Sequence, residues 1–274
     1  MTHPLSLAFL TVFDLGPVEA VRTAAAAGYD LVGLRILPAA ATGEPDYPLL
    51  TDDRLLARVR AALDDTGVAV GDVEIIRLRP VCDWDLFDRF CDRCAALGAR
   101  HVLVAGDDPD PARLADSLAR FADLAAPRGL TADLEFMPWT AVPDLTAAQA
   151  AVQAAGRPNA GVLVDALHYD RSATTLDQIA ALPADRVNYV QFCDGAVPYD
   201  PSDEALIRVA RGERLFPGQG GIDLVGLARA IPPGVTISVE VPHRALAARI
   251  DALGRAEMAM AATRAILRAA GRER

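Results

Sequence analysis

Apolar, β-branched runs alternate along the chain with alanine-rich stretches in which polar residues recur at helical spacing. Each run is almost continuously apolar, which is typical of strands that are buried on both faces of a parallel sheet. The amphipathic stretches between the runs predict helices that cover such a sheet. The predicted strands span residues 5–13, 30–37, 68–78, 100–106, 130–137, 160–167, 187–192 and 235–241.

Residues that begin and end helices occur at the expected places between these runs. Pro17 begins the first predicted helix and Gly28 follows its end, in line with the preference for proline in the first turn and glycine after the last. Thr51 is predicted to cap the second helix and Gly67 to end it. The remaining predicted helices span residues 83–98, 110–129, 146–156, 174–182 and 223–231, with one or two more over 244–271.

Eight strand–helix units in a chain of 274 residues predict an α/β fold, a closed (β/α)8 TIM barrel. A doubly wound open sheet is the alternative. No linker, internal repeat or low-complexity tract interrupts the pattern, so we expect one domain over residues 1–274.

Charge and composition exclude several functional classes. The formal net charge is −10, which argues against binding to a nucleic acid backbone. All 27 basic residues are arginine, and the absence of lysine excludes Schiff-base aldolases, pyridoxal-phosphate enzymes and P-loop nucleotidases. No apolar stretch is long enough for a membrane span, and the N-terminus lacks the features of a signal peptide. Four cysteines form no disulfide framework, so we expect a cytoplasmic protein.

Four of the later strands each place an oxygen-bearing side chain near the C-terminal end, the end at which TIM barrels carry their chemistry. Three of these residues are acidic and cannot lie together in ionised form without a cation. Oxygen ligands favour Mg²⁺ or Mn²⁺, with Co²⁺ as a further option. The predicted metal ligands are Glu135, Asp165, Gln191 and Glu240.

The segments LEFMPW (134–139), VDALHYD (164–170), VQFCDG (190–195), PGQGGIDL (217–224) and SVEVPH (238–243) resemble the xylose-isomerase-like TIM barrels. The resemblance covers roughly residues 5–267 and implies the same four metal ligands. That superfamily includes sugar isomerases and epimerases, inosose and dehydroshikimate dehydratases, and family 2 AP endonucleases. Many members have histidine at the position of Gln191. The hydroxypyruvate isomerases and the dehydroshikimate dehydratases are similar to this sequence in having glutamine at that position.

Further side chains are expected at the same face of the barrel. His168 follows Asp165 by three residues and is predicted to act as an acid, a base or a substrate donor. His101 is expected on the opposite face and His3 in the tail. Only His168 and His243 then lie on this face, which is too few histidines for the trinuclear zinc site of the endonuclease branch. The predicted substrate-binding residues are Arg35, Arg211, Arg214, His243 and Trp139.

This site predicts a metal-dependent isomerase or epimerase of a sugar, sugar acid or keto acid. The bound cation would acidify the C–H next to a carbonyl and stabilise an enediolate, while Glu135 and Glu240 transfer protons on opposite sides of the substrate. The alternative is a dehydratase of the dehydroshikimate or inosose type, in which His168 takes part. The expected partner is a small polyhydroxylated carbonyl compound, with no nucleic acid and no membrane. A homodimer or homotetramer is common in the family that the sequence resembles.

Overall fold

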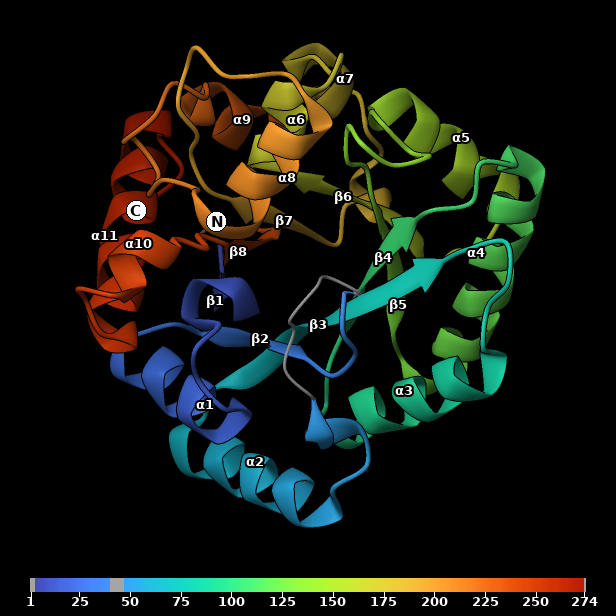
Figure 1. The fold of residues 1–274 in the computed structure, drawn as a ribbon, viewed down its shortest axis with the longest axis horizontal. Coiled ribbons are helices and arrows are strands. Elements are labelled where there is room, and N and C mark those ends of the chain that lie inside the picture. Colours follow the sequence, from blue (N-terminus) through green and yellow to red (C-terminus); the bar gives the residue numbers. More distant parts are fainter. Residues whose placement is uncertain (1–2, 40–46, 274) are drawn as a thin grey trace.

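The computed structural model describes residues 3–39 and 47–273. Eight strands pair in parallel in chain order, and the eighth pairs with the first, so the sheet closes into a barrel (Figure 1). The predicted TIM barrel is confirmed, and the open-sheet alternative is wrong. The strands are β1 (Leu5–Leu7), β2 (Leu31–Arg35), β3 (Ala69–Leu78), β4 (His101–Gly106), β5 (Thr131–Glu135), β6 (Ala160–Asp165), β7 (Tyr189–Phe192) and β8 (Thr236–Val239).

Helices surround the barrel, and in Figure 1 they form a ring around the strands. None of the described helices is both long enough and apolar enough to cross a membrane. The α-helices are α1 (Pro17–Ala26), α2 (Asp53–Thr66), α3 (Trp84–Ala96), α4 (Pro111–Ala125), α5 (Leu145–Ala155), α6 (Ala166–Arg171), α7 (Leu176–Ala180), α8 (Asp203–Gly212), α9 (Leu224–Ala230), α10 (Arg244–Ala247) and α11 (Ala252–Ala270). Short 3-10 turns are η1 (Phe9–Val12), η2 (Pro48–Leu50), η3 (Ala126–Arg128) and η4 (Ala184–Arg186).

The cap of α2 differs from the prediction by one residue. The side chain of Asp52, and not that of Thr51, accepts hydrogen bonds from the backbone N–H groups of Arg54 (2.8 Å) and Leu55 (3.0 Å). A carboxylate at this position also interacts favourably with the positive end of the helix dipole. Gly67 ends the helix as predicted, with φ of 74° in the left-handed region that glycine adopts most easily.

Several segments depart from the predicted pattern. The apolar run 5–13 forms a strand only as far as Leu7, after which the chain turns into η1. The segment after β7, in which no helix was predicted, contains α8, and the side chain of Ser202 accepts a hydrogen bond from the backbone N–H of Ala205 at its start. The terminal stretch 244–271, by contrast, forms two helices, α10 and α11, in agreement with the prediction of one or two. His3 is not a free tail residue, because it is buried and its Nδ1 lies 2.8 Å from the carbonyl oxygen of Val235.

Most of the hydrophobic core lies between the outer face of the barrel and the helices. The barrel interior is different, because a small apolar cluster that includes Leu103, Leu163 and Tyr189 shares it with buried acids. We call Asp72 and Asp133 the interior aspartates. They lie on β3 and β5, two residues before Glu74 and Glu135 respectively.

The two interior aspartates have unequal hydrogen-bonding partners. Asp133 accepts hydrogen bonds from Asn188 (2.6 Å) and Thr131 (2.5 Å). Asp72 accepts a bond from Ser238 at 3.3 Å through Oδ1, while its Oδ2 has no partner in the described part of the chain. A Cβ atom at Gly33 would lie 2.8 Å from that oxygen, so only glycine fits there. Burial raises the pKa of Asp72 to about 8 and that of Asp133 to about 7.

Candidate metal and active site

The four predicted metal ligands converge at the C-terminal end of the barrel. Glu135 and Asp165 are the last residues of β5 and β6, and Asp165 is the register partner of Gln191 on β7. Gln191 is followed by one more strand residue, and Glu240 comes directly after β8. Each of the four is at most 4% exposed. Because the C-terminal ends of parallel strands lie at one end of the barrel, four distant parts of the sequence meet at one buried site.

Two of the four, together with His168, lie close enough to share a small cation. Oxygens of Glu135 and Asp165 and a ring nitrogen of His168 lie within 4.8 Å of one another. Gln191 donates from Nε2 to Oε1 of Glu240 at 3.0 Å. The Oε1 atom of Gln191 is buried without a partner in the described structure, which is costly for an amide oxygen unless a cation or a water molecule binds it. This donor set of buried oxygens fits Mg²⁺ or Mn²⁺.

The charges of the site also favour a cation. Burial, reinforced by the charges of Asp165 and Glu240, raises the pKa of Glu135 well above its ordinary value. Burial likewise raises the pKa of Glu240 to about 8. Although burial opposes it, the Arg214 guanidinium holds the pKa of Asp165 below its ordinary value. If all three carboxyl groups ionise, one guanidinium leaves two negative charges, which a divalent cation would neutralise.

His168 lies next to the carboxylates, as predicted. Its Nε2 is 3.6 Å from Oε1 of Glu135 and 3.9 Å from Oδ1 of Asp165. Its Nδ1 has no partner among residues 3–39 and 47–273. The ring of Trp139 packs edge-on against the imidazole, with centroids 5.0 Å apart. Burial lowers the pKa of His168 to about 4, so the ring is neutral at neutral pH.

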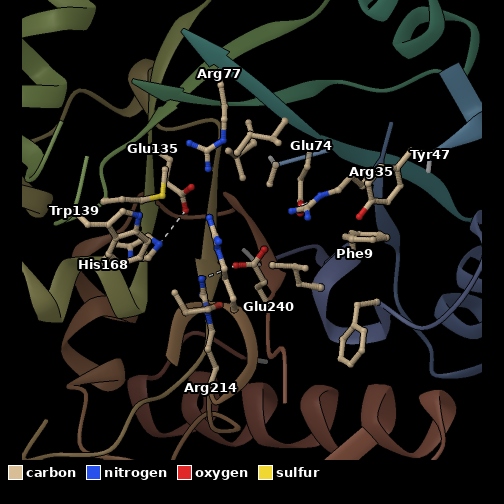
Figure 2. Close-up of a pocket in the computed structure, with 18 of the residues that line it drawn as sticks. Phe9, Arg35, Tyr47, Glu74, Arg77, Glu135, Trp139, His168, Arg214 and Glu240 are labelled. Atoms are coloured by element: carbon tan, nitrogen blue, oxygen red, sulfur yellow. Dashed lines mark hydrogen bonds and ion pairs between the residues drawn. The ribbon is translucent and has the colours of Figure 1, made fainter. Parts of the chain in front are cut away.

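A cavity of about 190 Å³ opens above the ligand set (Figure 2). Arg35, Arg211 and Arg214 line it as predicted, together with Trp139 and His168. Figure 2 shows Arg35 beside Glu74, near the rings of Phe9 and Tyr47. The Arg35–Glu74 ion pair is 2.5 Å long. Four of the five predicted substrate-binding residues therefore line one cavity.

His243 is the exception among the predicted substrate-binding residues. It lies at the start of α10, where its Nδ1 accepts a hydrogen bond from the backbone N–H of Leu246 at 3.3 Å. It does not belong to the described lining of the cavity. Its position favours a helix-capping role over contact with a substrate.

Two residues on β3 belong to the cavity but were not predicted as substrate contacts. Glu74 points into it with one oxygen, Oε1, that has no partner in the described residues. Arg77 enters from the same strand and approaches Glu135 in Figure 2. Its Nη1 donates to Asp107 at 2.7 Å, whereas its buried Nε has no partner in the described residues. Arg77 therefore brings a guanidinium group with one unpartnered N–H to the wall of the cavity.

Glu240 is fixed by contacts across the junction of β1 and β8. The hydroxyl of Thr11, in η1, donates to the carbonyl oxygen of Val239 at 2.8 Å. The same hydroxyl accepts a hydrogen bond from the N–H of Val241 at 2.7 Å. Thr11 thus binds the backbone on both sides of Glu240, so the segment after β1 orients a ligand that follows β8.

Comparison with known proteins agrees with this geometry. The sequence model of the xylose isomerase-like TIM barrel matches residues 21–266. The chain belongs to this family. A 3-dehydroshikimate dehydratase from Pseudomonas aeruginosa is 30% identical over 244 residues, which cover 81% of this chain and 36% of that protein. An inosose isomerase from Bacillus velezensis is 25% identical over 148 residues, covering 50% of this chain and 51% of that protein.

These alignments span a third to a half of the length of the two relatives, both of which are named as enzymes. Among solved structures, the IOLI protein with a bound zinc atom superimposes with a TM-score of 0.76 at 18% identity. That alignment covers 96% of this chain and 98% of the other. At this level of identity the similarity shows a shared fold.

Proposed function

We propose that this protein is a divalent-metal-dependent dehydratase that removes water from a cyclic polyhydroxylated keto acid of the 3-dehydroshikimate type. The charge of the cavity carries the proposal, because five arginines and three glutamates line it. This excess of positive groups occurs in a chain whose formal net charge is −10. A neutral ketose brings no negative charge to this arginine-rich lining, whereas a substrate carboxylate does.

The relatives also support a dehydratase ahead of an isomerase. The dehydratase aligns over 81% of this chain and the inosose isomerase over 50%. The sequence alone favoured an isomerase or epimerase over a dehydratase. The arginines of the cavity, and Arg77 in particular, reverse that order, since they favour an acidic substrate.

Each part of the site has a task in this reaction. Bound by Glu135, Asp165, Gln191 and Glu240, a divalent cation would supply Lewis acidity toward the carbonyl oxygen of the substrate. Arg77 would bind the substrate carboxylate, because its side chain lines the cavity and its Nε has no partner in the described residues. Trp139 would pack against the ring of the substrate and help to exclude water.

Elimination requires one proton to leave carbon and one to reach the departing hydroxyl. In our proposal Glu135 removes the proton from the carbon next to the carbonyl, and a carbon–carbon double bond forms as the β carbon–oxygen bond breaks. His168 can pass that proton on, because its Nε2 is 3.6 Å from Glu135 and its Nδ1 is not otherwise bound in the described structure. The hydroxyl then leaves as water, and both side chains return to their starting protonation states.

An isomerase or epimerase is the second candidate. Glu135 and Glu240 reach the cavity from β5 and from the end of β8, so a substrate between them meets a carboxyl group on two sides. Proton removal by one carboxyl group and return by the other would change the configuration without loss of oxygen. The inosose isomerase relative supports this alternative.

One experiment separates the two candidates. Protein stripped with EDTA and reloaded with Mn²⁺ is incubated in D₂O with 3-dehydroshikimate, and in parallel with inosose, hydroxypyruvate and ketoses. We expect the first mixture to yield a product lighter by one water, by mass spectrometry, and the others to show no deuterium incorporation by NMR. The EDTA-treated sample is the control. Deuterium incorporation without loss of water would establish the second candidate, and no reaction with any of these compounds would reject both.

A further inference from the structure

Arg214 is held more tightly than a substrate-binding arginine needs to be. It lies between α8 and α9, and its side chain is 3% exposed. Nη1 lies 2.5 Å from Oδ2 of Asp165, and Nη2 lies 2.9 Å from Oε2 of Glu240. Nε donates to the carbonyl oxygen of Ala210 at 3.0 Å. Every nitrogen of the guanidinium therefore has a protein acceptor, and two of these acceptors are predicted metal ligands.

The guanidinium occupies only one oxygen of each carboxylate. In Asp165 the other oxygen, Oδ1, accepts a hydrogen bond from the backbone N–H of His168 at 3.0 Å. In Glu240 the other oxygen, Oε1, accepts the bond from Gln191. Figure 2 shows Arg214 entering the site toward Glu240, on the side opposite to Arg77. The oxygens nearest to His168 and Gln191 are thus the ones left for a cation.

The charges of the set suggest why an arginine is built into it. Arg35, the other arginine nearby, is paired with Glu74. Among the described residues, Arg214 is the cation that directly contacts Asp165 and Glu240. When ionised, Glu135, Asp165 and Glu240 carry three negative charges, and Arg214 reduces their sum to two. Two negative charges match a divalent cation. Without the guanidinium, the site would be overcharged both before and after such a cation binds.

We infer that Arg214 is the resident counter-cation of the ligand set, a positioning residue that stabilises the metal-free site and lowers its affinity for the metal. This inference rests on the metal site of the proposed function. Arg214 and the metal act on the same carboxylates, so each lowers the attraction that the other experiences. A substrate-binding role would instead affect only the Michaelis constant, and a scaffold role would affect the protein equally with and without metal.

The test compares wild type with Arg214→Gln and Arg214→Lys, each metal-free and saturated with Mn²⁺. The glutamine variant removes the charge, and the lysine variant keeps it while losing the two-pronged contact. At pH 8.5 we expect the glutamine variant to lose more thermal stability without metal than with Mn²⁺. By linkage, its calorimetric Kd for Mn²⁺ should be about tenfold lower than that of wild type. The lysine variant should stay within about threefold of wild type.

The possible outcomes distinguish the inference from the proposed function. If wild type binds Mn²⁺ and the glutamine variant binds it equally or more weakly, the inference is wrong while the metal site stands. Equal loss of thermal stability in both states, or failure of the glutamine variant to fold with and without Mn²⁺, would also overturn it in favour of a scaffold role. Binding by the glutamine variant but not by wild type would support it. Absence of binding in both would reject the metal site and the inference together.

Discussion

Replacing Asp72 with asparagine is expected to stabilise the protein, and to do so increasingly as the pH rises from 5 to 7. The carboxyl group is 1% exposed inside the barrel, with one oxygen unpartnered among the described residues. Burial, reinforced by the charge of Glu74, raises its pKa from 3.8 to about 8. Asparagine has nearly the same shape, keeps an oxygen for Ser238, and carries no charge at any of these pH values.

The size of the effect follows from the two pKa values. Between them the unfolded chain has released the proton and the folded chain still holds it, so stability falls by about 1.4 kcal/mol per pH unit. The contribution is complete below the unfolded pKa of 3.8 and is lost as the pH rises to the folded value of about 8. From pH 5 to 7 the wild type should therefore lose about 3 kcal/mol through Asp72, and the variant should not.

Urea unfolding at pH 5, 6 and 7, followed by circular dichroism and tryptophan fluorescence, measures this difference. EDTA in every sample prevents any contribution from bound metal. Asp116→Asn is the matched control, because Asp116 is exposed on α4 and its replacement should leave the pH profile of the wild type unchanged. Parallel stability curves for wild type and Asp72→Asn would refute the reasoning, since they would show that Asp72 titrates alike in the folded and unfolded chains.

Three further predictions concern the reaction and its substrates. Glu240→Gln should lower kcat by about a thousandfold while circular dichroism shows an intact fold, because the side chain keeps its volume and loses its charge; near-normal turnover would remove Glu240 from the mechanism. Arg77→Gln should raise KM for an acidic substrate by about tenfold to a hundredfold, since a charge-assisted hydrogen bond is lost. Arg79→Gln is its control, because Arg79 is half exposed and also lies near Asp107; equal KM values in the two variants would contradict a carboxylate-binding role of Arg77. Finally, the protein should not incise DNA at abasic sites with Mn²⁺ or Zn²⁺, given its net charge of −10; efficient metal-dependent cleavage in a gel assay would contradict this.

The barrel and the positions of the candidate metal ligands could be predicted because both depend on local features of the sequence. Apolar runs fix which segments are strands, and the direction of the chain fixes which end of each strand faces the site. The positions of Glu135 and Asp165 follow from the strand pattern alone, since they are the last residues of β5 and β6. The cap of α2 at Asp52 was missed by one residue because neighbouring Thr and Asp residues can both cap a helix.

The roles of Glu74, Arg77 and Arg214 depend on contacts that no local pattern specifies. The pairing of β3 with β4 shifts register between Val73 and Ile76, so counting alternate residues along the strand does not show which side chains face the cavity. Arg214 lies 49 residues from Asp165 in sequence, and its bond to that carboxylate exists only in the closed barrel. The sequence indicated it only as a substrate-binding residue, because its partners on β6 and after β8 cannot be read from its neighbours.

The contact of Thr11 with the backbone around Glu240 has a consequence for biosynthesis. A ribosome delivers η1 early and Glu240 more than two hundred residues later, so Glu135, Asp165 and Gln191 are synthesised before their fourth partner. While the nascent chain lacks β8, the sheet cannot close and Thr11 has no backbone to bind. The complete set of candidate ligands therefore forms only when β8 joins the barrel, and a truncated translation product would contain most of the barrel without this site.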